Sequence, residues 1–159
     1  MGLFNRKDNS AKIVSPMTGR VIAVTDVPDP VFSGKVLGDG VGIVPDSGEV
    51  CSPVSGTVVQ IAHTKHALGI ESDDGLEILV HLGVDTVKLE GEGFTCHVEV
   101  GQHVNAGDRL MDMDLEFIKS KELSTISPCI ITNMDVIKNL SLQTGNAVGG
   151  QTTVMTYKK

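Results

Sequence analysis

The chain has 159 residues, a length typical of one globular domain and too short for two independent hydrophobic cores. Its 13 basic and 20 acidic side chains give a net charge of −7, and no basic stripe of the kind that binds nucleic acid is present. Such an acidic surface suits partners that are neutral or basic. Hydrophobic residues make up 40% of the chain but aromatic ones only 3%, so Val, Ile and Leu must build the core.

Short runs rich in β-branched residues, separated by Gly, Pro and Asp, predict strands along the whole chain. In chain order these runs are Arg20–Val24, Val41–Val44, Gly56–Ala62, Ala67–Glu71, Leu76–Leu82, Cys96–Val100, Arg109–Met113, Ile130–Thr132 and Thr153–Tyr157. Two short helices are expected among them: one is capped by Asp114 and carries Leu115, Ile118 and Leu123, and one is capped by Asn133 and carries Val136, Ile137 and Leu140. The pattern predicts an all-β fold, an antiparallel sandwich or barrel with one or two very short helices.

The termini and cysteines indicate where such a protein works. Residues 1–12 lack the apolar stretch of a secretory signal, so we expect a flexible leader there and a single domain over residues 13–159. No apolar run approaches the roughly 18 residues of a membrane span. Cys51, Cys96 and Cys129 are odd in number and form no CxxC, which predicts free thiols in a reducing compartment. A soluble cytoplasmic protein is expected.

One internal repeat is visible. The run from Ser15 to Val24 lines up with the run from Ser52 to Ile61, each a Pro-led turn, a Gly and a β-branched strand. The offset of the two copies predicts two similar β-units that pack as one body with pseudo-symmetry.

A second phrase, Gly101–Leu110, resembles the corresponding hairpin of biotinyl and lipoyl carrier domains. Those carriers attach their cofactor to a Lys flanked by Met, whereas this chain has Met111-Asp112-Met113. The Asp argues against a tethered cofactor.

Two of the five histidines stand in an unusual context. His81 ends the most apolar run of the chain, and an imidazole there needs a polar partner such as the carbonyl of Gly83. His66 opens the preceding strand, and Ser72–Gly75 has the composition of a tight hairpin turn. Counting back through that turn places both rings at the same end of adjacent antiparallel strands, where they can face each other. Thr64 can bond the second imidazole, and His63 is expected on the surface.

Facing imidazoles admit several interpretations. One ring could carry a phosphoryl group while the other stabilises its oxygens, the pair could bind metal, or it could be a buried polar pair that serves stability alone. No Walker-type nucleotide loop and no Gly-x-Ser-x-Gly elbow occurs in the chain. A phosphohistidine in such a protein would have to be loaded by another phosphoprotein.

Longer phrases around the histidines carry a family resemblance. They are Thr64–Ala67, Ile70–Glu77, Val80–Val87 and Leu89–Phe94, joined by Asp26–Phe32, Gly38–Val41 and Pro128–Asp135. Together they closely resemble the glucose-type enzyme IIA of the bacterial phosphoenolpyruvate-dependent sugar phosphotransferase system. The similarity runs from about Ile13 to Tyr157.

The resemblance implies a β-sandwich that relays phosphate. His81 would take a phosphoryl group on Nε2 from the phosphocarrier HPr and pass it to a cysteine of the IIB domain of a sugar permease. His66 would stabilise the phosphoryl oxygens, Thr64 would orient His66, the Gly83 carbonyl would hold His81 Nδ1–H, and Asp85 would tune the pair. The chain would act as a monomer at the inner face of the membrane, with no cofactor required and no contact with the sugar, which the sequence therefore does not name.

The resemblance also implies an apolar depression around the histidines where partners dock. The matching positions here are Val31, Phe32, Ala62, Leu68, Leu79 and Val87. Phe32, beside the Pro28–Pro30 turn, is the candidate docking anchor, and the alternative is that it is an ordinary core Phe.

Two other functions stay open. Relatives in this family bind and restrain transporters and a kinase, so a regulatory binding module is one alternative. Zinc peptidases of the lysostaphin type are the other: His81 and Asp85 have their His-x-x-x-Asp spacing, but no His-x-His occurs in the chain. A zinc ion held by His66 and His81 alone should bind weakly, because two imidazoles leave the other tetrahedral positions without a protein ligand.

Overall fold

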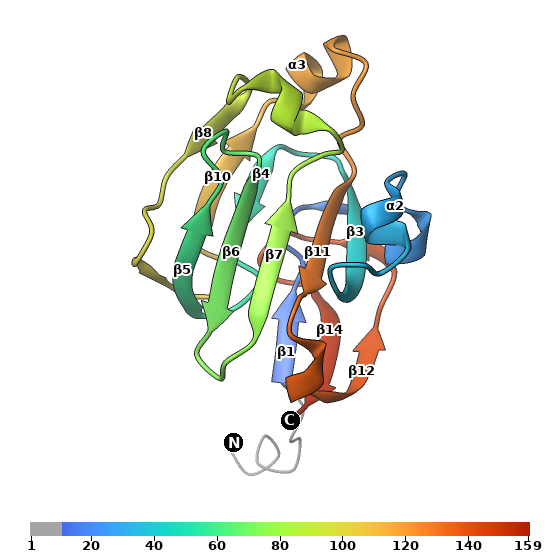
Figure 1. The fold of residues 1–159 in the computed structure, drawn as a ribbon, viewed down its shortest axis with the longest axis vertical. Coiled ribbons are helices and arrows are strands. Elements are labelled where there is room, and N and C mark those ends of the chain that lie inside the picture. The colour runs from blue at the N-terminus through green and yellow to red at the C-terminus, as the bar shows by residue number, and fades with distance from the viewer. Residues whose placement is uncertain (1–10) are drawn as a thin grey trace.

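The computed structural model describes residues 11–159, which form three antiparallel sheets around a main hydrophobic core, with a second, smaller cluster of buried residues (Figure 1). The large sheet has the order β13-β2-β3-β11-β7-β6-β5-β9, with bounds Gly145–Ala147, Gly19–Ala23, Asp39–Pro45, Ser127–Ile131, Glu77–His81, Ala67–Ser72, Gly56–Ile61 and His103–Val104. A second sheet pairs β4 (Glu49–Cys51), β10 (Arg109–Met113) and β8 (Phe94–Cys96), and a third pairs β1 (Ala11–Val14), β14 (Thr153–Lys158) and β12 (Lys138–Leu142). The predicted all-β fold is confirmed.

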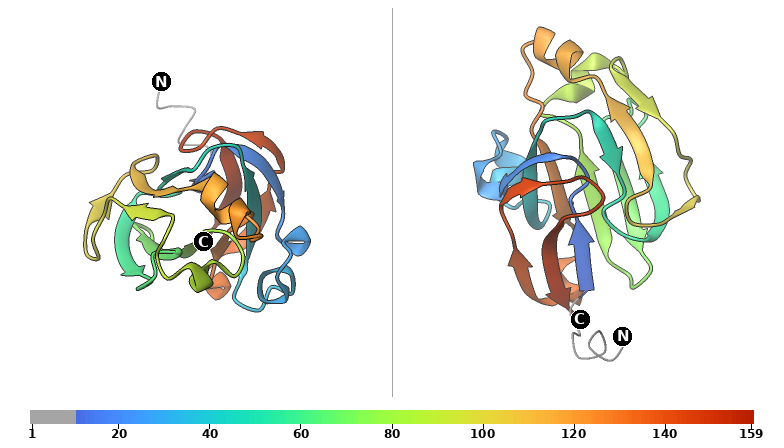
Figure 2. Two further views of the ribbon diagram at one scale, coloured as in Figure 1. Left: turned by 90° about the horizontal axis from the view of Figure 1, so that it is seen from above. Right: turned by 180° about the vertical axis from the view of Figure 1, so that it is seen from behind.

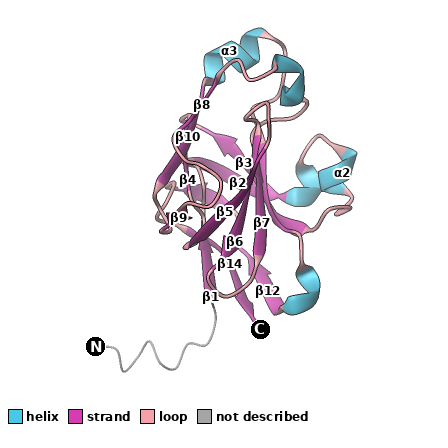
Figure 3. Cartoon of the chain, turned by 60° about the vertical axis from the view of Figure 1, so that its left-hand side comes forward, coloured by secondary structure: helices cyan, strands magenta, loops and turns pink. Residues whose placement is uncertain are grey.

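The core lies between the large sheet and the two smaller ones. The right-hand view of Figure 2 shows the arrangement of the sheets from behind. On β6 and β7 alternate residues point inward: these are Leu68, Ile70, Ile78 and Val80, all almost fully buried. Helices are few and short, as the secondary-structure colouring of Figure 3 shows. They are α2 (Pro30–Ser33), α3 (Leu115–Ser120) and the single 3-10 turns η1 (Val24–Asp26), η2 (Thr86–Leu89) and η3 (Met134–Val136). None of the helices within residues 11–159 has the length and apolar character needed to cross a bilayer.

The internal repeat is confirmed by paired hydrogen bonds. Ser15 and Ser52 are fully buried, and each hydroxyl donates to the carbonyl two residues on, at 2.6 Å in both copies. The copies also bond to each other: the amide of Val14 donates to the carbonyl of Pro53, and the amide of Cys51 donates to that of Pro16. These are equivalent positions in the two units, so an approximate two-fold axis relates the two copies of the repeat.

The helix predicted after Asn133 is wrong. Asn133 Oδ1 accepts from the amide of Glu77 at 2.8 Å, and its Nδ2 donates to the carbonyl of Gly75 at 3.0 Å. Its side chain therefore binds the β6–β7 hairpin and cannot cap a helix. The chain makes one 3-10 turn, and Leu140 then lies in strand β12, which pairs with β14.

Other boundaries differ in smaller ways. Asp114 caps α3 as predicted, through the amide of Phe117. The expected strand at Cys96–Val100 ends at Cys96, and the sequence pattern did not reveal β1, β4, β9, β12, β13 or α2. The predicted leader covers residues 1–12; residues 1–10 lie outside the described residues, whereas Ala11 and Lys12 belong to β1. The cysteines Cys51, Cys96 and Cys129 are free.

Candidate functional site: a histidine pair at the end of the large sheet

The two histidines meet where β6 begins and β7 ends, at the upper end of the sheet in Figure 1. Strand register places Ala67 opposite His81, and the amide of Leu82 donates to the carbonyl of His66 at 2.7 Å. The ring centroids of His66 and His81 are 5.0 Å apart and the planes cross at 77°, edge to face. The predicted facing of the two imidazoles is confirmed.

The backbone at Gly83 sets the tautomer of His81. His81 Nδ1 lies 2.8 Å from the Gly83 carbonyl oxygen, which can only accept, so Nδ1 carries the proton. Nε2 is then unprotonated and keeps its lone pair. This is the nitrogen that a nucleophilic histidine must offer.

Only glycine fits at position 83. Its φ is +80°, and a Cβ there would lie 2.6 Å from Thr86 Cγ2 and 2.8 Å from the carbonyl oxygen of Ser124. The Gly83 amide donates to the buried hydroxyl of Ser127 at 3.1 Å, and the Thr86 hydroxyl donates to the carbonyl of Leu82 at 2.5 Å. The close packing around Gly83, its bond to Ser127 and the bond from Thr86 to Leu82 therefore fix the turn that presents the acceptor carbonyl.

Thr64 orients the second ring. Its Oγ1 lies 2.6 Å from His66 Nδ1. If the hydroxyl donates, Nδ1 accepts and the proton of His66 sits on Nε2, where it is free to be donated. The structure thus brings together a lone pair on one ring and, in this tautomer, an N–H on the other.

Burial keeps both rings neutral near neutral pH. It lowers the pKa of His81, and the bond to Gly83 and the carboxylates of Asp29 and Asp85 oppose this effect without cancelling it. Burial, followed by the nearby His81, lowers the pKa of His66. A neutral imidazole is the form that acts as a nucleophile.

Two of the expected docking residues near the pair are buried. Phe32 is 4% exposed and packs with Val24, Val27, Val84 and Ile130, its ring 5.1 Å from that of His81. Leu68 is fully buried because it alternates with Ala67 and Gly69 on β6 and points into the core. Neither side chain offers surface to a partner.

The remaining predicted docking residues do reach the surface. Val31 and Val87 are 42% and 50% exposed, and Ala62 and Leu79 are half-buried. Asp85 is exposed at the start of η2, where Lys88 lies 4.0 Å from its carboxylate. His63 is exposed, as expected.

The sequence pattern did not identify two residues that lie near the histidine pair. Asp29 caps α2 through the amide of Val31, and the Asp-Pro step at its start is a helix signal that would have revealed it. Ser127 lies 44 residues from Gly83 along the chain and carries no local signal.

A third metal ligand is missing from this arrangement. Within residues 11–159, no group of three His, Cys, Asp or Glu side chains lies close enough to hold an ion. The two imidazoles therefore form an incomplete site, which does not match the ligand set of a catalytic zinc centre.

Comparisons with known proteins find similar sequences over most of the chain. Residues 11–137 match the family described as phosphoenolpyruvate-dependent sugar phosphotransferase system, EIIA 1. The chain is 52% identical to a glucose-specific EIIA component of Bacillus anthracis over 150 residues, which cover 94% of this chain and 91% of that protein. It is 49% identical to the Staphylococcus aureus component of the same name over 144 residues, covering 90% and 87%.

A solved structure extends the match to three dimensions. The glucose permease IIA from Mycoplasma capricolum shares 40% identity and superposes with a TM-score of 0.88, covering 94% of this chain and 97% of that one. It confirms the predicted β-sandwich. The chain therefore belongs to the EIIA 1 family of the phosphoenolpyruvate-dependent sugar phosphotransferase system.

Proposed function

We propose that this protein accepts a phosphoryl group from phospho-HPr on Nε2 of His81 and passes it to a cysteine of the IIB domain of a sugar permease. The observation that carries the proposal is the 2.8 Å bond between His81 Nδ1 and the Gly83 carbonyl, because it leaves Nε2 as the nucleophile. The relatives' names point to glucose as the sugar. The relay would run in the cytoplasm, at the inner face of the membrane where the permease lies.

Each transfer exchanges one bond to phosphorus for another. In the loading step the Nε2 lone pair of His81 attacks phosphorus, and the N–P bond of the carrier breaks with its electron pair returning to the carrier's imidazole. Nδ1 keeps its proton, so the phosphorylated ring is positively charged. The Gly83 carbonyl and the carboxylates of Asp29 and Asp85 stabilise that charge.

The unloading step reverses the roles. The thiolate of the IIB cysteine attacks phosphorus, the bond to Nε2 breaks, and the electron pair returns to His81. Charge spreads over the three phosphoryl oxygens in the transition state. His66 Nε2–H, directed by Thr64, donates to one of these oxygens.

Substitution of His81 tests the acceptor. Incubation with phosphoenolpyruvate, enzyme I and HPr should give one acid-labile, base-stable phosphate per chain, and His81→Gln should take up none. Label that persists in His81→Gln would disprove the assignment of the acceptor.

Substitution of His66 separates the two roles. His66→Gln keeps the nucleophile, so it should still be phosphorylated, but onward transfer to IIB should slow. Loss of one preorganised donor lowers a rate by roughly 10²–10³. Transfer at the wild-type rate would mean that the second histidine is structural only.

A further inference from the structure

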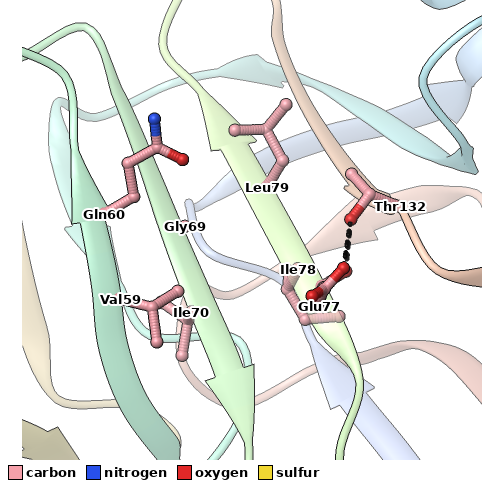
Figure 4. A pocket seen from close by; sticks show the side chains of 8 residues that line it. All are labelled: Val59, Gln60, Gly69, Ile70, Glu77, Ile78, Leu79 and Thr132. Atoms are coloured by element: carbon pink, nitrogen blue, oxygen red, sulfur yellow. Dashed lines mark hydrogen bonds between the residues drawn. The ribbon is translucent and has the colours of Figure 1, made fainter.

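Hydroxyl groups at the two ends of the β11 segment bond to the neighbouring β7 segment. Far from the histidines, the Thr132 hydroxyl bonds to the Glu77 carboxylate on the exposed face of the sheet, as Figure 4 shows. Beside the histidines, the Ser127 hydroxyl accepts from the Gly83 amide, and Ser127 is fully buried. Water can replace the exposed bond when it breaks but not the buried one, so Ser127 has the stronger hold on the backbone.

The Ser127 hydroxyl has a fixed direction. Its one proton goes to the carbonyl of Thr125 at 2.9 Å, because Met113 Sδ, at 3.9 Å, is a much weaker acceptor. A lone pair is then left for the Gly83 amide, 3.1 Å away. The hydroxyl is therefore satisfied on both sides and holds the amide in one place.

The peptide group between Leu82 and Gly83 is held at both ends. Its N–H donates to Ser127, and its carbonyl accepts from the Thr86 hydroxyl at 2.5 Å. Thr86 is fully buried as well. Because a peptide group is planar, bonds to its N–H and to its carbonyl together fix its orientation. The hydroxyl groups of Ser127 and Thr86 thus form a clamp on the backbone.

The next peptide group, between Gly83 and Val84, carries the carbonyl that binds His81. That carbonyl lies 2.8 Å from His81 Nδ1, and the Val84 amide donates to the carbonyl of Ser124 at 3.1 Å. Glycine joins the two peptide groups, at a φ of +80°, and it restrains rotation between them less than any other residue. The direction of the acceptor carbonyl therefore depends on the clamp that holds the preceding peptide.

The position of that carbonyl decides which tautomer His81 adopts. The neutral ring has one proton, which stays on Nδ1 only while an acceptor faces Nδ1. In the other tautomer the proton is on Nε2, which then has no lone pair to attack phosphorus. Movement of the Gly83 carbonyl would therefore lower the fraction of the protein that can be phosphorylated.

We propose, building on the function proposed above, that Ser127 and Thr86 are positioning residues for phosphoryl transfer. Their hydroxyl groups hold the Leu82–Gly83 peptide so that the Gly83 carbonyl keeps the His81 proton on Nδ1. Both act through the backbone, because both are fully buried and bond to the turn and not to either imidazole. Loss of a residue that orients a histidine costs roughly 10–100-fold in metal sites. The lower end, about tenfold, is expected here because the carbonyl is displaced and not removed.

Ser127→Ala tests the effect on the tautomer directly. Long-range proton–nitrogen NMR correlations of the His81 ring, recorded where the ring is neutral, distinguish the two tautomers. The wild type should show Nδ1–H alone, and Ser127→Ala a mixture of both forms. Ser15→Ala is the matched control: Ser15 is fully buried too, and its hydroxyl donates to the Met17 carbonyl at 2.6 Å and accepts from the Met17 amide at 3.4 Å. It should lower the melting temperature by a similar amount and leave the His81 spectrum unchanged.

Two phosphoryl donors measure the effect on the reaction. Phospho-HPr needs a docked complex, whereas phosphoramidate transfers its phosphoryl group to an imidazole and releases ammonia without one. Ser127→Ala should be loaded about tenfold more slowly by both donors, and Ser15→Ala at the wild-type rate by both. A fall with phospho-HPr alone would assign Ser127 to docking and overturn the proposal.

Two more variants separate a missing hydroxyl from a damaged fold. Ser127→Thr keeps the hydroxyl and should restore both the tautomer and the rate. Thr86→Val removes the other hydroxyl at nearly the same shape, so it should act like Ser127→Ala, and it carries the test if Ser127→Ala does not fold. Pure Nδ1–H and wild-type loading in folded Ser127→Ala or Thr86→Val would refute the clamp. If the wild type takes phosphate from neither donor while Ser127→Ala still changes the tautomer, the proposed function fails and the control of the His81 tautomer stands.

Discussion

Replacement of Phe32 by Ala should destabilise the fold strongly, although the sequence favours this residue as a docking anchor. Its side chain is 4% exposed in the cluster formed with Val24, Val27, Val84 and Ile130. Loss of a buried Phe side chain costs about 3–5 kcal/mol of unfolding free energy. Since α2 has only four residues and lies on the outer face of the sheet, it can partly close over the cavity, and the cost should fall near 3 kcal/mol.

The melting temperature converts this cost into a measurable quantity. For a chain of about this length, 1 kcal/mol shifts the melting temperature by roughly 2–4 °C, so Phe32→Ala should melt about 6–12 °C below the wild type. Scanning calorimetry measures this directly. Val31→Ala is the control, because Val31 is next to it on α2 but 42% exposed, and it should change stability by no more than about 0.5 kcal/mol.

The same substitution should also affect the histidine pair. The Phe32 ring is 5.1 Å from that of His81 and helps to bury it. Phe32→Ala should therefore let water reach His81 and bring its pKa back toward the ordinary value, which NMR titration of the ring would detect. Melting within about one degree of the wild type, with an unchanged His81 titration, would refute this account of Phe32.

The sequence was sufficient for the parts of the fold that depend on local patterns. Alternating apolar residues identified most strands of the large sheet, and the hairpin turn at Ser72–Gly75 set the register that brings His66 and His81 together. The same alternation, applied strictly, would have placed Leu68 on the core side with Ile70. Short elements such as α2 and β13 span too few residues for a period to be visible.

Contacts between distant segments explain the remaining errors. Asn133 has the composition of a helix cap, yet its amide is used by Glu77 and Gly75, more than fifty residues away. Ser127 reaches Gly83 across 44 residues of chain. The burial of Phe32 likewise depends on Ile130 of strand β11 beneath it. The three-dimensional fold brings such partners together, so no local sequence pattern predicts them.

Three further predictions concern hydrogen bonds and pH. Thr64→Val should leave loading of His81 nearly intact but slow transfer to IIB, because His66 loses the partner that sets its tautomer; Thr64→Ser should restore the rate. Tyr157→Phe should lower the unfolding free energy by about 1–3 kcal/mol in urea denaturation, since the buried Tyr157 hydroxyl donates to Asp74 at 2.7 Å. The last prediction is that stability falls as the pH drops below about 6.5. Burial lowers the pKa of His81 and of His66 in the folded protein, so near and below their ordinary value of 6.5 the unfolded chain binds more protons than the folded one. Their contribution is therefore fully present above pH 6.5 and is lost as the pH falls toward the folded-state pKa values. Urea denaturation at pH 7.5, 6.5 and 5.5 should show a smaller loss in His81→Gln than in the wild type, because the variant lacks one of the two titrating rings. Equal losses in both proteins would mean that His81 titrates alike in the folded and unfolded chain, and that the fold does not hold its ring neutral.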